Sequence, residues 1–299
     1  MKKKPVITSF IIIMSTILTA CGGGAPTAAD LLEDIQNRGY IMVSTDPNYE
    51  PQSFLNTTGK RPADSICPSD ALTPDEMQGF DVDVAVEIGK RLGVDTCFAT
   101  PEWDMITAGN WADKWDISVG SMTIDFIRLE VLDFTTPYYY TPAMIAALTE
   151  SGLTSVDDLS GQAVCAATST TYEAWLSGTL QLPASQIYIQ PPSNVTIVTL
   201  PTDQECAQAM AAGRKDFIAY VTSDTVIDAN IAAGIPVSKV GSPVFSEFLA
   251  VAIDKAHTLP TATLLKSVDD IIIAMHADGT LSNLSIKWFG ADLTQDPTK

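Results

Sequence analysis

Apolar residues recur with helical and with strand spacing along this chain, and the two kinds of segment alternate. Val84, Ile88 and Leu92 lie four positions apart, which places them on one face of a helix, whereas short apolar runs are typical of strands. Up to residue 131 the pattern predicts helices over 30–38, 82–92 (with Asp81 as N-cap) and 125–131, and strands over 40–45, 95–99 and 116–119. Strands that alternate with helices indicate an α/β layer architecture.

The alternation restarts after residue 160. It predicts strands over 162–167, 195–200, 217–222 and 248–253, and helices over 170–176, 203–212, 225–233 and 264–275. The segment 56–78 is polar, contains three prolines and is predicted to be an irregular surface insertion. A chain of 299 residues exceeds one typical domain of roughly 100–200 residues, so we expect two lobes or domains.

The first twenty residues have the pattern of an export signal. Lysines at 2–4 precede an apolar run over 6–18, which is shorter than the roughly 20 residues that span a bilayer. The run ends Leu-Thr-Ala-Cys at Cys21, which resembles a bacterial lipobox. We therefore expect a lipoprotein signal peptide over 1–20, an acylated Cys21 and a flexible tether over 21–29. An ordinary signal peptide with a chance cysteine is the alternative.

Charge and cysteine content exclude some classes of function. With 17 basic and 36 acidic residues, the chain is repelled by phosphate backbones, which disfavours nucleic acids as partners. If Cys21 is acylated, four cysteines remain, an even number that favours disulfides in an exported chain, with buried free thiols as the alternative. The chain has no Cys-x-x-Cys spacing, no G-x-S-x-G, no H-E-x-x-H and no P-loop, so we expect no metal, no cofactor and no hydrolase.

Several short motifs occur in a characteristic order between residues 40 and 290. They are Ser-Thr-Asp-Pro-Asn-Tyr-Glu-Pro over 44–51, Gly-Phe-Asp-Val-Asp over 79–83 with Lys-Arg-Leu-Gly over 90–93, Gly-Ser-Met-Thr over 120–123 with Arg128, Asp-Phe-Thr over 133–135, and Ala-Asp-Gly-Thr over 277–280 with Lys-Trp-Phe-Gly over 287–290. In this order, and behind a lipobox, they resemble family 3 of the bacterial extracellular solute-binding proteins, which serve polar amino acid ABC transporters.

The resemblance implies a fold and a division of the chain. The fold would be an α/β, two-lobed periplasmic-binding-protein-like (type II) fold with two crossing hinge strands, and the lobes would close over a ligand. Residues 30–140 plus 244–299 would form the first lobe and 141–243 the second. This division favours Cys67–Cys97 and Cys165–Cys206 among the three possible pairings, because each pair then lies within one lobe.

The resemblance also implies a function. The protein would be a monomeric extracytoplasmic lipoprotein, anchored at the cell surface or in the periplasm, that captures an amino acid in the interlobe cleft and delivers it to the permease. Two alternatives stay open: an exported dehydratase acting on prephenate or arogenate, and a ligand-sensing partner of a membrane receptor. The identity of the ligand stays open, and an amino acid with a polar or basic side chain is favoured.

Arg128 is expected to bind the carboxylate of the ligand, because it follows Thr123 by five positions, as the family's carboxylate-binding arginine does. A guanidinium binds a carboxylate with two hydrogen bonds. Around it, Ser121 and Thr123 resemble the family's first-lobe contact loop. Asp224, which follows a predicted strand, is the expected partner of the ligand's ammonium group, with helix capping as the alternative. In the second lobe a turn is expected to contribute Ser169, Thr170 and Thr171, with simple capping by Thr170 as the alternative.

Further side chains are expected to surround the side chain of the ligand. Tyr49 and Trp103 resemble first-lobe positions that flank it, since aromatic faces accept apolar or cationic groups, with core packing as the alternative for both. Gln52 would form a polar wall where many relatives carry phenylalanine. Asp46 would meet a basic side chain or would be only a turn residue before a proline.

Overall fold

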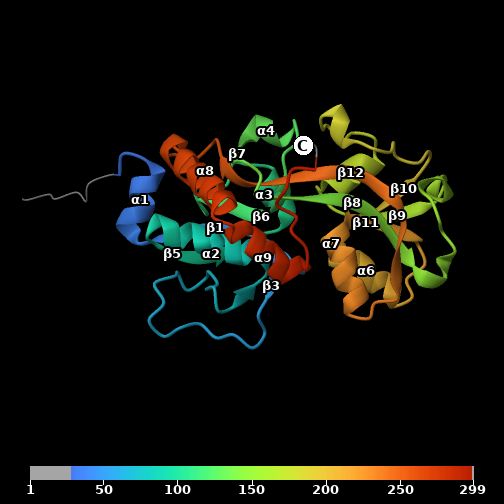
Figure 1. Ribbon diagram of the computed structural model, residues 1–299, viewed down its shortest axis with the longest axis horizontal. Helices are drawn as coiled ribbons and strands as arrows, with labels where there is room; N and C mark the ends of the chain where they lie inside the picture. The colour runs from blue at the N-terminus through green and yellow to red at the C-terminus, as the bar shows by residue number, and fades with distance from the viewer. Residues whose placement is uncertain (1–27, 298–299) are drawn as a thin grey trace, which may run out of the picture.

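The computed structural model describes residues 28–297, so the predicted signal peptide, Cys21 and most of the tether lie outside the described residues. Two α/β lobes lie side by side, joined by two long strands that run from one lobe into the other, β8 (Tyr139–Leu148) and β12 (Val237–Asp254) (Figure 1). One nine-stranded sheet passes through both lobes in the order β10-β9-β11-β8-β12-β6-β1-β5, with β7 paired to β12.

The first lobe is built from residues on both sides of the second lobe in sequence. Its strands are β1 (Tyr40–Ser44), β5 (Asp95–Ala99), β6 (Ile117–Thr123) and β7 (Leu132–Phe134), with a small sheet of β2 (Asn48–Tyr49), β3 (Ser53–Leu55) and β4 (Met77–Gln78). Its helices are α1 (Leu31–Arg38), α2 (Phe80–Leu92), α3 (Trp103–Thr107), α4 (Arg128–Val131), α8 (Ala262–Ala277) and α9 (Thr280–Phe289).

The second lobe repeats the alternation of strand and helix. Its strands are β9 (Ala163–Ala167), β10 (Thr196–Leu200) and β11 (Ala219–Ser223). Its helices are α5 (Thr171–Leu176), α6 (Asp203–Ala211) and α7 (Asp224–Ala232), with short 3₁₀ turns at Thr149–Ser151, Val156–Leu159 and Ala184–Gln186.

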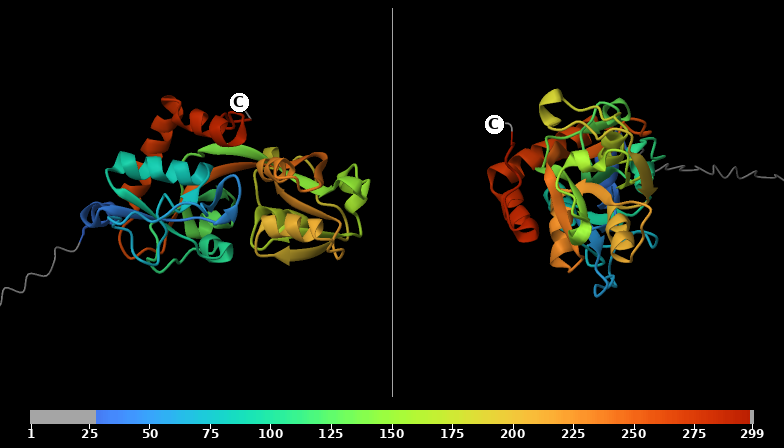
Figure 2. Two further views of the ribbon diagram at one scale, coloured as in Figure 1. Left: turned by 90° about the horizontal axis from the view of Figure 1, so that it is seen from below. Right: turned by 90° about the vertical axis from the view of Figure 1, so that its right-hand side faces the viewer.

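The hinge strands divide their pairing between the lobes. Residues 143–147 of β8 pair with β11 of the second lobe, whereas residues 249–254 of β12 pair with β6 and β7 of the first. Between the lobes β8 and β12 pair with each other, with a register shift between Val240 and Phe245. The left view of Figure 2 shows both strands at the crossing.

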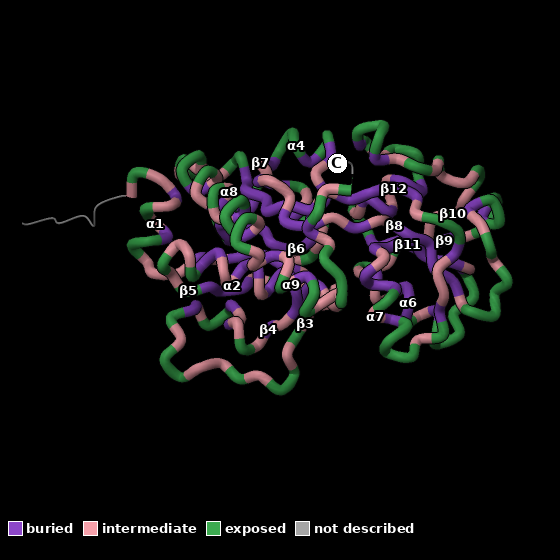
Figure 3. Tube along the Cα trace, in the orientation of Figure 1, coloured by how far each residue is buried: buried purple, intermediate pink, exposed green. Residues whose placement is uncertain are grey.

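Separate apolar cores stabilise the lobes. The largest first-lobe core packs α2 and α8 against the sheet and draws on residues 31–139 and 249–281, while two cores of the second lobe draw on residues 143–245. Figure 3 shows the buried trace concentrated on the sheet and the insertion before β4 mostly at the surface. Because the largest first-lobe core and the two second-lobe cores share no residue, each lobe has a core of its own.

The disulfides pair as expected. Cys67 of the insertion bonds to Cys97 of β5, and Cys165 of β9 bonds to Cys206 of α6. The first bond attaches the irregular insertion to the sheet, and the second attaches a helix of the second lobe to its strand.

Several element boundaries differ from the prediction. Gly79, not Asp81, is the N-cap of α2, and Asp81 lies inside the first turn with a fully buried side chain. The predicted helix over 125–131 forms only as α4, and the strand predicted over 248–253 is the end of the 18-residue β12. Within residues 28–297 no helix is long and apolar enough to cross a bilayer, and no cluster of side chains suits a metal ion.

Candidate functional site

A cavity lies between the lobes, and both lobes contribute to its wall. Most of its lining residues follow the carboxyl ends of parallel strands, where open α/β sheets generally place their ligands. The lining residues are Asp46, Tyr49, Trp103, Gly120, Ser121, Thr123, Arg128, Ala167, Thr170, Thr171, Tyr172, Pro201, Thr202, Asp203 and Glu247.

The lobes are in contact around this cavity. Asn48 Nδ2 donates to Thr202 Oγ1 at 3.0 Å, and the Tyr49 and Tyr172 hydroxyls lie 3.0 Å apart. Each of these hydrogen bonds joins a first-lobe residue to a second-lobe residue. The structure therefore shows the closed arrangement of the lobes.

Arg128, the first residue of α4, brings a buried guanidinium to the cavity with only 5% of the residue exposed. Nη1 donates to the Thr123 carbonyl at 3.0 Å, Nη2 donates to the Ser169 carbonyl at 3.2 Å, and Nε lies 3.4 Å from Asp125. Each terminal nitrogen carries two N–H groups, so one on each has no partner among the described residues. Two donors are thus left for a carboxylate.

The second-lobe turn approaches Arg128 from the opposite side. Ser169 adopts a left-handed φ of 61°, which non-glycine residues rarely do. It meets Arg128 through its carbonyl and does not line the cavity. Thr170 and Thr171 do line it; Thr170 also caps α5, since its Oγ1 accepts from the Glu173 N–H.

Asp224, expected beside the ligand's ammonium group, is placed elsewhere. Its carboxylate lies 2.7 Å from Lys239 Nζ of β12, which also pairs with Asp228, and it does not line the cavity. Its negative charge is therefore already neutralised by a lysine of the hinge strand. Gln52 also departs from the expectation: it is fully buried away from the cavity and donates to Thr225 of the other lobe at 2.5 Å.

Asp203 and Glu247 are cavity carboxylates that the sequence reasoning missed. Asp203 begins α6 directly after Thr202, is 3% exposed and accepts from the Ala167 N–H at 3.3 Å. Burial raises its pKa to about 8. The sequence feature that could have identified Asp203 is the pair Thr202-Asp203, a hydroxyl residue followed by an aspartate, just after the predicted strand over 195–200.

Glu247 lies within the hinge strand β12, where no motif marks it. It is 2% exposed and accepts from the Thr123 hydroxyl at 2.7 Å, the Thr171 hydroxyl at 3.0 Å and the Tyr172 hydroxyl at 2.9 Å. Burial raises the pKa of this carboxyl. Because Thr123 and Thr171 belong to different lobes, Glu247 joins both walls of the cavity.

The first-lobe aromatic residues and Asp46 form the remaining wall. Trp103 stacks near Arg128, with the guanidinium carbon 5.7 Å from the ring centre, and its Nε1 has no partner among the described residues. Asp46 accepts from the Asn48 N–H at 2.7 Å, and burial raises its pKa to about 6. Tyr49 closes the wall through its contact with Tyr172.

The lining therefore carries three carboxyl groups, Asp46, Asp203 and Glu247, against one cation, Arg128. Across the described residues none of the three forms an ion pair within 4 Å. Buried charge is costly without a partner, so the cavity suits a ligand that brings a carboxylate to Arg128 and at least one cation to the acids.

Comparison with known proteins agrees with this geometry. A family model described as bacterial extracellular solute-binding proteins, family 3, matches residues 41–291. The chain is 30% identical over 289 residues to an L-cystine-binding protein of Escherichia coli K12, covering 95% of each chain. It is 29% identical to a probable amino-acid-binding protein of Bacillus subtilis, covering 98% of each chain.

Solved structures share the fold. A mutant arginine-binding protein of T. maritima superposes with a TM-score of 0.70 at 22% identity, covering 87% of this chain and 99% of that one. An ancestral amino acid-binding protein, a precursor of cyclohexadienyl dehydratase, superposes with a TM-score of 0.69 at 28% identity, covering 86% and 99%. With the family model spanning both lobes, the chain belongs to family 3 of the bacterial extracellular solute-binding proteins.

Proposed function

We propose that this protein is the extracytoplasmic substrate-binding component of an ABC transporter, which encloses a free amino acid between its lobes and delivers it to the permease as a monomer. The observation that carries the proposal is the buried Arg128, which faces a closed cavity with two uncommitted N–H groups. The relatives support a binding role rather than catalysis, because those named above are binding proteins.

The ligand's two backbone charges have complementary partners in the cavity. Its α-carboxylate would accept from Arg128, in the bidentate arrangement that guanidinium favours. Its α-ammonium would donate to Asp203, with Glu247 on the hinge strand close by. This assignment replaces Asp224, whose charge Lys239 neutralises.

A cationic or strongly polar side chain fits the remaining wall best. Once one acid has met the α-ammonium, the lining still carries an excess of carboxyl groups, and Asp46 lies beside Tyr49 and Trp103. Aromatic faces and a carboxylate together favour an extended cation such as that of arginine or lysine. Among relatives and solved structures, arginine-binding and cystine-binding proteins are both represented.

A lipid on Cys21 would keep the protein at the outer face of the cell membrane. Support comes from the lipobox-like residues that precede it and from the segment of mostly small residues over 22–29, which shows no apolar periodicity. Two or three acyl chains on one residue anchor a protein stably, whereas a single chain is marginal.

A melting-temperature screen against the common amino acids tests the proposed function. The protein is residues 22–299, denatured, stripped of ligand and refolded. Ligand at 100 times its Kd adds about 2.7 kcal/mol to the free energy of unfolding, which gives a measurable shift. Stabilisation by one or a few amino acids supports the proposal, and no response across the panel contradicts it; prephenate is included to detect a dehydratase substrate.

Arg128→Lys is the matched variant for this screen. Lysine keeps the positive charge but cannot donate two parallel hydrogen bonds to one carboxylate. We expect Kd for the stabilising amino acid to rise about 30-fold by isothermal titration calorimetry, on the order of 2 kcal/mol. An unchanged Kd would remove Arg128 from the carboxylate site.

A further inference from the structure

We infer that Asp81, a buried carboxylate that does not reach the cavity, is a positioning residue that holds Ser121 and thereby places the first-lobe wall of the ligand site. The inference rests on the proposed function, because it concerns the same cavity. It also adds a role for Ser121, which was expected only as part of the first-lobe contact loop.

Asp81, Ser121 and Tyr138 form a closed ring of hydrogen bonds. Asp81 is fully buried in the first turn of α2. Its Oδ2 accepts from Ser121 Oγ at 2.7 Å, and its Oδ1 accepts from the Tyr138 hydroxyl at 2.8 Å. The Tyr138 oxygen in turn accepts from the Ser121 N–H at 2.9 Å. The hydroxyl and the amide of Ser121 are therefore both held inside the first lobe.

Ser121 needs such an anchor because of its backbone. It has a φ of 53°, in the left-handed region that non-glycine residues rarely adopt, and it lies inside the buried strand β6. A conformation of this kind costs free energy and persists only where the surroundings over-determine it. The hydrogen bonds from Ser121 to Asp81 and Tyr138 are local interactions that can hold it.

The conformation of Ser121 determines where the next residues point. Two positions later, the Thr123 carbonyl accepts from Arg128 Nη1, and the Thr123 hydroxyl donates to Glu247. If Ser121 relaxes to an ordinary β conformation, the peptide planes that lead to Thr123 must turn. Arg128 and Glu247 would then lose hydrogen bonds that orient them toward the ligand.

The same network reaches the hinge. With Ser121 Oγ donating to Asp81, the Tyr139 hydroxyl, 2.7 Å from that oxygen, is left to donate to it. Tyr139 is the first residue of the hinge strand β8. Asp81 is thus joined through one serine to both the cavity wall and one of the two strands that connect the lobes.

A double-mutant cycle separates this role from simple core packing. The variants are Asp81→Asn, Ser121→Gly and both together, because glycine accepts a φ of 53° without an anchor. We expect Asp81→Asn to raise Kd for L-arginine about tenfold in the parent chain and less than twofold in the Ser121→Gly background. Equal effects in the two backgrounds would overturn the inference, since a purely structural Asp81 would not act through Ser121.

Asp83→Asn is the control for the change in charge. Asp83 lies two residues away on α2 but pairs with Lys287 and Trp288, outside the cavity lining. We expect it to change Kd for L-arginine less than twofold. A tenfold effect of Asp83→Asn would show that charge on α2, rather than the anchor, controls affinity.

A ligand-free readout keeps the inference testable if L-arginine does not bind. In ¹H–¹⁵N spectra, Asp81→Asn should shift the Thr123 amide and the Arg128 Nε–H resonance, whereas Asp83→Asn should leave both in place. Unshifted resonances in Asp81→Asn would overturn the inference. Absence of binding by the unmodified chain to every amino acid of the panel would instead overturn the proposed function.

Discussion

At the scale of single residues, two aspartates in closely similar local contexts have different environments. Asp203 and Asp224 each begin a helix directly after a hydroxyl residue, Thr202 or Ser223. Asp224 is neutralised by Lys239, whereas Asp203 is buried in the cavity wall without an ion pair. The unpaired carboxylate is the one that can bind a ligand cation.

Asp203→Asn should therefore weaken binding of the cognate amino acid strongly. Losing one partner of a buried, hydrogen-bonded charge pair costs about 2–5 kcal/mol, so we expect Kd to rise about 100-fold or more. Titration calorimetry measures this, with Asp224→Asn as the control, which should change Kd less than about twofold. The reverse order of effects would restore Asp224 as the ammonium partner.

Binding should strengthen as the pH rises from 5 to 8. Burial raises the pKa of Asp46 to about 6 and that of Asp203 to about 8, so both bind protons more tightly in the folded than in the unfolded chain. The ligand-free protein consequently loses stability as the pH rises from about 4 through these values. A cationic ligand favours the ionised carboxylates, so binding releases protons and Kd falls with pH.

Isothermal titration calorimetry in two buffers of different ionisation enthalpy gives the number of protons released when the ligand binds. Net release between pH 6 and 8 is expected, and less of it in Asp203→Asn. Proton uptake, or a Kd that does not change with pH, would contradict the assignment of a ligand cation to these carboxyl groups.

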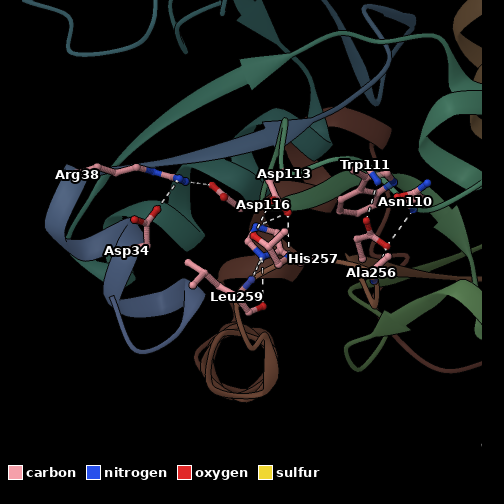
Figure 4. A network of polar contacts seen from close by, with 11 residues as sticks. Asp34, Arg38, Asn110, Trp111, Asp113, Asp116, Ala256, His257 and Leu259 are labelled. Carbon is pink, nitrogen blue, oxygen red and sulfur yellow. Dashed lines mark hydrogen bonds and ion pairs between the residues drawn. The ribbon is translucent and has the colours of Figure 1, made fainter. Parts of the chain in front are cut away.

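At the scale of elements, the loop after α3 has a support of its own (Figure 4). Asn110, Ala112 and Asp113 all have φ between 52° and 58°, and the loop carries Trp111, which packs on Trp115. Asp254, at the end of β12, accepts from the N–H groups of Asn110 and Trp111. The loop that follows the helix bearing Trp103 is thus tied to the end of a hinge strand.

Asp254→Ala should destabilise the fold. The carboxylate is 2% exposed and also accepts from the Ala256 N–H, so its removal leaves three backbone donors without this acceptor. We expect a loss of about 2–4 kcal/mol in the free energy of unfolding, measured by urea denaturation. Asp270→Ala, which removes an exposed pair with Lys266, should cost less than about 0.5 kcal/mol; similar losses in both variants would argue against this role for Asp254.

At the scale of the whole molecule, the place of α1 relative to the interlobe cavity bears on the proposed anchor. The lobes enclose the cavity, and α1, where the folded part begins, lies at the end of the first lobe away from the second (Figure 1). The N-terminal end of the described residues therefore lies away from the interlobe cavity. This arrangement is compatible with lobe movement in a membrane-anchored protein.

Cys21→Ser tests the anchor. Without the acylated thiol, no lipid joins the mature chain to the membrane, so we expect the protein to move from the membrane fraction to the soluble fraction. Immunoblotting of fractionated cells measures this, with the unmodified chain as the reference. Continued membrane association of Cys21→Ser would argue against a lipid anchor.

Local sequence was sufficient for much of the fold and part of the site. The short strands and amphipathic helices follow from side-chain periodicity, and motif resemblance placed Arg128, Thr123 and Tyr49 in the cavity wall. It was insufficient for the start of the long hinge strand β12. The segment over 237–247 shows no strict apolar alternation, and residues 237–240 and 245–247 are held as strand by pairing with β8. Glu247 lies in that segment, so no local sequence pattern marked it as a cavity residue.

Residue type and spacing along single segments were thus enough to predict the α/β alternation, the export pattern, the even set of cysteines and the arginine of the cavity wall. Which acids line the cavity, and which side chains Asp81 contacts, depended instead on how distant segments come together in the fold. Asp203 and Asp224 have closely similar neighbours in sequence, and they differ because Lys239, from a distant strand, lies beside one of them. Asp81 has the local pattern of a helix cap, yet Ser121 and Tyr138 meet it only after the chain has folded. Electrostatic and hydrogen-bond partners are set by proximity in space, which a pattern of neighbouring residues does not contain.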